Sequence, residues 1–185
     1  MKAIGNFFKD LLIGIWIVIA VFTTVCLISY NDYNVSVFGK TSLVIIDNEE
    51  LEPDFYDGDL VFVTKEGQKK YIKDEKIFFY SGNKSQENFI NLGTITDIQT
   101  SDGAETAYYL GETKVSYSDV IGKVDGVYVM HNIGTILGIL ESRWGYMFVV
   151  IMPTLFALVY EIFAIINEVK DESDKDTDED DDDKE

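Results

Sequence analysis

The chain has 185 residues, which is enough for one domain of ordinary size plus appendages. It carries 15 basic and 33 acidic residues, for a formal net charge of −18, and the 12 acids and three lysines of residues 168–185 supply half of that charge. Such an anionic chain argues against nucleic-acid binding, which needs basic residues to neutralise phosphates. Because Cys26 is the only cysteine, an intrachain disulfide is excluded.

A first apolar stretch, residues 11–30, follows a short N-terminal segment, residues 1–10, and contains no charged residue. At about 1.5 Å per residue, a helix of this length covers the roughly 30 Å hydrocarbon core of a bilayer. The apolar part of a cleaved signal peptide is only about 7–15 residues long and ends at a small-residue cleavage site. Residues 23–29 contain no such Ala-x-Ala pattern. The stretch therefore predicts an uncleaved transmembrane helix.

Residues 31–144 are more polar and rich in β-forming residues, and turn-forming residues separate most of the apolar runs. An amphipathic segment, 133–143, closes this region. The region predicts an extramembrane, mainly β domain. The expected strands are Ser42–Ile46, Leu60–Thr64, Glu75–Tyr80, Phe89–Ile98, Thr106–Leu110 and Val120–Val129, with turns at 57–58, 67–68, 81–83 and 101–103.

A second apolar stretch, residues 145–166, predicts another transmembrane helix. Pro153 should kink it, because proline removes a backbone donor. The charge of Glu161 allows three placements: it faces protein, it extends to the membrane interface, or it marks the boundary of the span. The last two are favoured. Residues 167–185 form an acidic, low-complexity tail that we expect to be disordered.

Basic residues beside the two spans indicate the orientation. Lys2 and Lys9 precede the first span, and Lys170 and Lys175 follow the second. By the positive-inside rule both termini are cytoplasmic and the β domain is extracytoplasmic. The sequence thus predicts an α+β, multi-pass protein of the cell membrane, with a mainly β domain between two transmembrane helices.

The most informative stretch is an acidic turn, residues 50–59, that leads into the apolar run 60–63. Pro53 fixes its own φ, and Asp57-Gly58-Asp59 supplies a turn before a strand. The order Glu-Leu-Glu-Pro, spacer, Gly-Asp-Leu-Val resembles the first conserved box of signal peptidase I. The resemblance places Leu51, Pro53, Gly58 and Asp59 on conserved positions beside the substrate groove. It places Glu50 where that family has its serine nucleophile.

Other segments extend the resemblance to the archaeal, sporulation and endoplasmic-reticulum branch of the family. Residues 71–80, 119–124 and 153–155 resemble later segments of that branch in order and spacing. The resemblance puts Gly93 at the position of the histidine base, and it makes Glu112 and Asp119 candidates for retained acids. A glutamate that attacked a peptide as nucleophile would form a mixed anhydride, which gives no reason to expect peptide hydrolysis. A glycine has no side chain that could accept a proton as general base. The family resemblance therefore implies a peptidase fold without its serine and histidine.

Several further interpretations follow from the residue inventory. A relocated serine and lysine pair would need both groups beside oxyanion donors, which a serine far from the turn lacks. His131 without a partner predicts a polar surface or interfacial role. The acids of residues 47–59 do not match an EF-hand, so no metal or other cofactor is expected. The relocated pair would draw on Ser42, Ser81, Ser85, Ser101, Ser116, Ser118, Lys65, Lys69, Lys70, Lys73, Lys76 and Lys114.

Three functional hypotheses remain open at this point. The first is a signal peptidase I-like pseudopeptidase of the export pathway, which binds signal peptides or exported proteins through main-chain hydrogen bonds. The second is an active serine-type signal peptidase. The third is a membrane-anchored structural protein without a peptide ligand.

Overall fold

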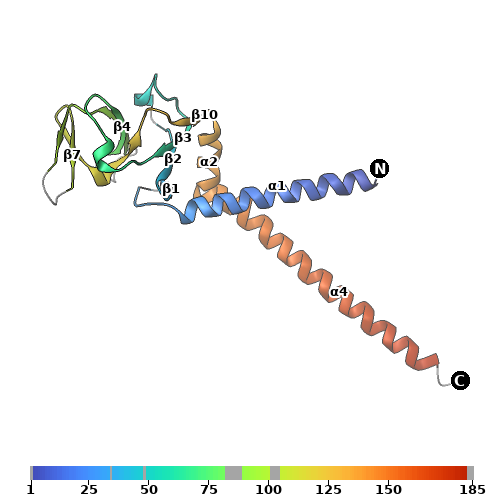
Figure 1. Ribbon diagram of the computed structural model, residues 1–185. Coiled ribbons are helices and arrows are strands. Elements are labelled where there is room, and N and C mark those ends of the chain that lie inside the picture. The colour runs from blue at the N-terminus through green and yellow to red at the C-terminus, as the bar shows by residue number, and fades with distance from the viewer. Residues whose placement is uncertain (1, 34, 48, 82–88, 101–104, 183–185) are drawn as a thin grey trace. The chain divides into compact units, whose positions relative to one another are not determined.

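The computed structural model describes residues 2–33, 35–47, 49–81, 89–100 and 105–182 (Figure 1). The chain forms two compact units, Met1–Glu141 and Ser142–Glu185. The turns predicted at 81–83 and 101–103 and two of the candidate nucleophiles, Ser85 and Ser101, lie largely or wholly outside the described residues.

The first unit begins with a long helix, α1 (Lys2–Ile28). Its part Asp10–Ile28 is long and apolar enough to cross a membrane. Most of its apolar side chains are exposed, whereas Thr23 and Cys26 near its C-terminal end are fully buried. The helix predicted over residues 11–30 is therefore present and ends two residues earlier than expected, and its length and composition permit a membrane crossing.

An antiparallel sheet of four strands follows α1, with β1 (Ser36–Phe38), β2 (Thr41–Ile45), β3 (Leu60–Thr64) and β10 (Tyr128–Met130) in the order β1-β2-β3-β10. Successive side chains of a strand point to opposite faces of a sheet. Each face of this four-stranded sheet packs against a different hydrophobic core. In β3, Val61 and Val63 belong to one hydrophobic core and Leu60 to another.

Two further antiparallel sheets, of three strands each, complete the β domain. The central sheet has the order β5-β4-β9, with β4 (Lys76–Tyr80), β5 (Ile90–Thr94) and β9 (Val120–Lys123). The outer sheet has the order β6-β7-β8, with β6 (Asp97–Gln99), β7 (Ala107–Leu110) and β8 (Thr113–Ser116).

Strand β4 separates two hydrophobic cores. Phe78 and Tyr80 join the first core, which they share with Val61 and Val63 of the four-stranded sheet. Ile77 and Phe79 join the second core, which includes Tyr108 and Val115 of the outer sheet. Strand β4 is therefore apolar on both faces, and this pattern is typical of a strand buried on both sides.

Two long strands expected from the sequence are each divided in the structure. The run 89–98 is interrupted where the N–H of Ile95 donates to Glu75 and the N–H of Thr96 donates to Tyr109, so the chain passes from the central to the outer sheet. The run 120–129 is divided between β9 and β10, which pair with different sheets. No turn-forming residue marks the first change of partner, at Ile95-Thr96, whereas Asp125-Gly126, with Gly126 at a φ of +77°, marks the second. The short strands β1 and β8 were not predicted.

The first unit ends with α2 (Ile133–Glu141), which covers the four-stranded sheet. Its buried residues are Gly134 and Leu137, and Leu137 shares a third core with Cys26, Leu43 and Leu60. This core joins α1, α2 and the sheet. The remaining short elements are 3₁₀ turns, at Glu49–Leu51, Gln68–Lys70 and Tyr117–Asp119.

The second unit is a helical segment that begins with α3 (Arg143–Tyr146), continues through a π-helical turn (Met147–Ile151) and becomes α4 (Met152–Asp182). The part Arg143–Lys170 is long and apolar enough to cross a membrane. The π-helical turn lies just before Pro153, where the predicted kink would fall, because proline cannot donate its i→i−4 hydrogen bond.

The backbone of α4 also continues through residues 167–182, where the sequence predicted disorder. A helix that is already propagating gains one hydrogen bond for each residue added, whereas an isolated tail must first form a costly nucleus. The preceding apolar helix thus supplies the helical nucleus from which the helix continues into the acidic tail.

The close packing of α2 makes a prediction about its glycines. A Cβ at Gly134 would lie 2.5 Å from the backbone oxygen of Asp59, whereas a Cβ at Gly138 would meet only Ile45, at 3.9 Å. Alanine in a helix is better than glycine by about 0.5–1 kcal/mol, but overpacking costs about 1–3 kcal/mol. We expect Gly134→Ala to lower the free energy of unfolding by about 1–2 kcal/mol and Gly138→Ala to leave it unchanged or raise it. Denaturant unfolding in detergent would measure both, and equal effects would contradict this packing.

Candidate functional site

The acidic turn of residues 50–59 is held by backbone hydrogen bonds to Ile46 and by two side chains buried in the first core. The N–H of Gly58 donates to the carbonyl of Ile46 at 2.8 Å, and the N–H of Ile46 donates to the carbonyl of Asp59 at 2.9 Å. The peptide bond Glu52–Pro53 is cis. Leu51 and Phe55 are buried in the first core, so the turn is held on both sides of Pro53, which is itself exposed.

A buried carboxylate lies at the end of this turn. Asp59 is only 2 % exposed, and its Oδ2 accepts a hydrogen bond from the N–H of Tyr56 at 3.1 Å. Its Oδ1 lies 2.8 Å from Nδ1 of His131, a residue 72 positions later in the chain. An ionised carboxylate only accepts hydrogen bonds, so Nδ1 of His131 is the donor. Nε2 is then the basic nitrogen of the neutral ring, and the imidazole is 69 % exposed.

The start of α2 packs directly on the same turn. The N–H of Thr135 donates to the carbonyl of Gly58 at 3.2 Å. Gly58 has a φ of +84°, and a Cβ there would lie 2.3 Å from Oγ1 of Thr135. Glycine is required at this position for its backbone conformation and for the close approach of the helix. The turn, β10 and α2 therefore meet at the pair Asp59 and His131.

Strand β10 forms one edge of the four-stranded sheet beside this pair. Met130 pairs with Leu60, the residue after Asp59, and His131 follows Met130 directly. Among the described residues, β10 pairs with β3 alone, so one side of its backbone has no strand partner. The ring of Tyr128 is 64 % exposed at the other end of β10. An edge of this kind can accept an extended peptide as an additional strand.

The two expected catalytic positions lie in different elements, and Gly93 faces the core opposite to the one that holds Leu51, the neighbour of Glu50. Glu50 lies in the 3₁₀ turn Glu49–Leu51, beside Leu51 of the first core. Gly93 lies in β5, and a Cβ there would be 2.8 Å from Cδ1 of Leu110, which packs against the second core. A side chain at Gly93 would thus project toward the opposite face from that of Leu51.

The candidate retained acids lie near the outer sheet. Glu112 is exposed in the connection between β7 and β8, and Asp119 ends the 3₁₀ turn Tyr117–Asp119. Asp119 acts electrostatically on Lys65, whose pKa is lowered by burial. Lys65 donates through Nζ to the backbone carbonyl of Ser118 at 3.0 Å, and not to its hydroxyl. This contact does not form a serine and lysine catalytic pair.

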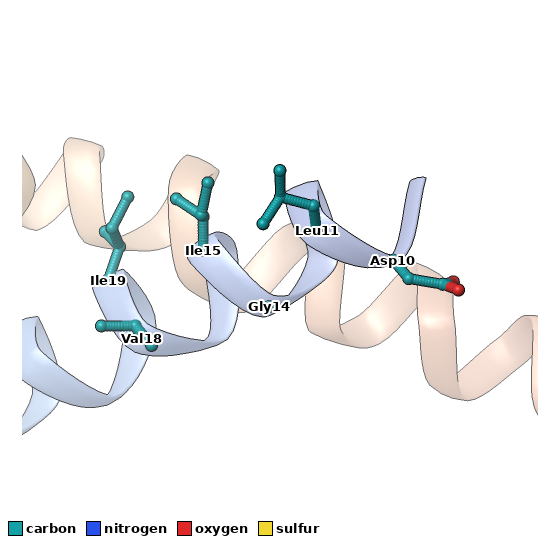
Figure 2. Close-up of a pocket in the computed structure, with 6 residues that line it drawn as sticks. All are labelled: Asp10, Leu11, Gly14, Ile15, Val18 and Ile19. Carbon is teal, nitrogen blue, oxygen red and sulfur yellow. The ribbon is translucent and has the colours of Figure 1, made fainter. Parts of the chain in front are cut away.

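An apolar groove on α1 is a different kind of feature. It lies beside Gly14 and is lined by Asp10, Leu11, Ile15, Val18 and Ile19 (Figure 2). Apart from Asp10 at one end, its lining has no group that could bind the backbone of a peptide. The groove therefore fits contact with lipid or with another helix and is not a site for chemistry.

A second polar cluster lies where α1 ends. Oε2 of Glu141 accepts a hydrogen bond from the hydroxyl of Tyr30 at 2.7 Å, and Oε1 accepts one from Ser36 at 3.4 Å. The single hydroxyl hydrogen of Ser36 is shared between Glu141 and the carbonyl of Cys26, which lies nearer, at 3.1 Å. Burial raises the pKa of Glu141 above its ordinary value, and hydrogen bonds from Tyr30, Ser36 and Cys26 offset that effect in part. The cluster connects the end of α2 to the end of α1.

Sequence reasoning placed Asp59 in a conserved box but gave His131 only a surface or interfacial role. No short-range pattern joins two residues 72 positions apart. The usable signal was that the chain has a single histidine and that it directly follows an apolar run.

The single histidine makes the pair measurable. In the neutral ring we expect the proton on Nδ1, because a buried carboxylate accepts it. The ¹⁵N shifts of histidine-labelled protein report the tautomer. Asp59→Asn should allow both tautomers, since an amide can donate or accept, whereas Asp57→Asn, at an exposed position of the same turn, should change nothing. A neutral wild-type ring protonated on Nε2 would contradict the contact.

The raised pKa of Glu141 predicts a dependence of stability on pH. The fold favours the protonated carboxyl, so this contribution to stability is full at low pH and is lost as pH rises through the folded-state pKa. Glu141→Gln should remove this pH dependence, because an amide does not titrate. The Tm of each protein, measured in detergent from acidic to neutral pH, tests this prediction. Glu112→Gln, at an exposed position, is the control. An identical pH dependence in wild type and Glu141→Gln would overturn the assignment.

Comparisons of the chain with protein-family models and with curated proteins found no match. The function is therefore inferred from the residues and their geometry.

Proposed function

We propose that the chain is a membrane-anchored, signal peptidase I-like protein whose extracytoplasmic β domain binds extended segments of exported proteins without cleaving them. Two helices that are long and apolar enough to cross a membrane support the anchoring. The orientation, with both termini cytoplasmic, follows from the lysines beside the spans.

One observation carries the binding part of the proposal. Strand β10 is an edge strand that ends beside the turn with the family-like sequence, at the pair Asp59 and His131. Main-chain hydrogen bonds to such an edge supply affinity, and they need no serine nucleophile. Tyr128 offers an exposed aromatic ring to side chains of the added strand.

The absence of cleavage rests on the residues at the family positions. Glu50 stands in place of the serine, and Gly93 stands in place of the histidine. Peptide hydrolysis by that route needs a nucleophile within hydrogen-bond reach of its base. Gly93 faces Leu110 and the second core, so even a histidine there would project away from the face that holds Leu51.

An active signal peptidase is the second candidate, and one observation favours it. Asp59 and His131 form a carboxylate and imidazole pair of the type that orients a general base. In this case His131 would replace the family base from a different position in the chain. Cleavage of a secreted preprotein that is lost in His131→Ala would establish this candidate.

The proposed binding can be tested by photocrosslinking in nanodiscs. A photoreactive phenylalanine analogue at Tyr128 should crosslink a peptide derived from a secreted preprotein. The same analogue at Phe38, on the opposite edge strand β1 of the same sheet, is the matched control and should crosslink much less. The peptide should be recovered at full length, because no cleavage is expected.

A second peptide separates strand addition from general stickiness. N-methylation at alternate residues removes main-chain donors and leaves the side chains unchanged, so it should abolish the crosslink at Tyr128. Crosslinking that persists with the methylated peptide, or that is equal at Phe38, would contradict binding at β10. Release of a cleaved product would contradict the non-catalytic function.

A further inference from the structure

We propose that the outer face of α2 is inserted into the surface of the bilayer, so that α2 lies between the membrane and the β domain. This inference rests on the membrane anchoring proposed above, but it does not depend on peptide binding. The partner it assigns to α2 is the lipid interface.

The outer face of α2, formed by Ile133, Ile136 and Ile139, is apolar and exposed on the protein, so we expect it to be buried against lipid or another molecule. Its residues 133–140 contain no charge, and Thr135 has the only side chain among them with a group that can form hydrogen bonds. Gly134 and Leu137 face the protein, whereas Ile136 and Ile139 are 54 % and 59 % exposed. With Ile133, these isoleucines recur every three residues and form a stripe along one side of the helix. A helix that is apolar on all sides is stable in water only when it is covered.

The position of α2 indicates what covers it. Its inner face packs on β2 and β3, and its C-terminal end contacts α1. Figure 1 shows that α2 runs crosswise to α1 and that α1 extends away on the side opposite the sheet. If α1 crosses the bilayer, α2 lies along the membrane surface with its outer face toward the lipid.

Hydrogen bonds and chain connectivity fix this end of α2 near the boundary of the bilayer. Tyr30, two residues after the end of α1, donates to Glu141, the last residue of α2. The second apolar segment begins at Arg143, two residues after Glu141. The C-terminal end of α2 therefore lies close to the end of α1, where Ile28 is 80 % exposed.

Lipid fits this face better than water or a folded partner. An interfacial helix buries its apolar face about 5–10 Å into the boundary between headgroups and acyl chains. The polar face that such a helix usually needs is replaced here by packing on the sheet. Because His131 and β10 directly precede α2, insertion would place the edge of β10 close to the membrane surface.

The experiment uses the full chain in nanodiscs with single fluorescent labels. Ile136→Cys and Ile139→Cys test the stripe, Ile15→Cys marks the first span, and Lys114→Cys marks the outer sheet. Cys26 is fully buried, and the unaltered protein measures any labelling of it. Nitroxide lipids should quench the labels on the stripe about as well as the label at Ile15 and several-fold more than that at Lys114. Aqueous iodide should show the reverse order.

Three results would overturn the proposal. Labels on the stripe that iodide quenches as strongly as at Lys114 would place the face in water. Protection from both quenchers that increases with protein concentration would assign the face to a second copy. Lack of lipid quenching at Ile15 would overturn the anchoring and this inference together. Photolabelling of the unaltered chain from a lipid-borne diazirine provides a test without substitutions, and it should modify residues 133–141.

Discussion

The arrangement of the first unit depends on the hydrogen-bonded carboxylate of Asp59. An unpaired charge in that position would be costly, so its two oxygens must both find donors. One donor comes from the turn, at Tyr56, and the other from the chain after β10, at His131. The same turn leaves room for α2 only because Gly58 and Gly134 lack side chains. One polar contact and two glycines thus determine how the turn, the sheet edge and α2 meet.

Much of the fold follows from local sequence. The two apolar stretches, the strand Leu60–Thr64 and the helix before the second span were predicted, because each is marked by a composition or a period. The division at residues 95–96 was not predicted, since no turn-forming residue marks the point where the chain changes sheets. The division at 124–127 does carry a local signal, Asp125-Gly126 with Gly126 at a φ of +77°, which the predicted strand 120–129 ran through. Pairing between distant strands depends on tertiary packing, which a local pattern does not specify.

The candidate site was predictable only in part for the same reason. The turn and its Gly-Asp pair could be recognised, because turn chemistry is local. The role of Leu51 in the core and the direction of Gly93 depend on which face of the central sheet each side chain joins. A one-residue change of register reverses that direction, so alignment to a motif cannot settle it. The partner of Asp59 was missed because the contact spans 72 residues.

Two polar clusters hold the two ends of α2. Asp59 and His131 hold its start against the sheet, and Glu141 holds its end against α1 through Tyr30 and Ser36. Between them the helix is apolar and makes its contacts by packing alone. An exported peptide added to β10 would end at the first cluster, while the second cluster lies beside the end of the first span. The two ends of α2 are thus held by hydrogen bonds between distant parts of the chain, whereas its middle depends on apolar packing and on the close approach of Gly134 to the acidic turn.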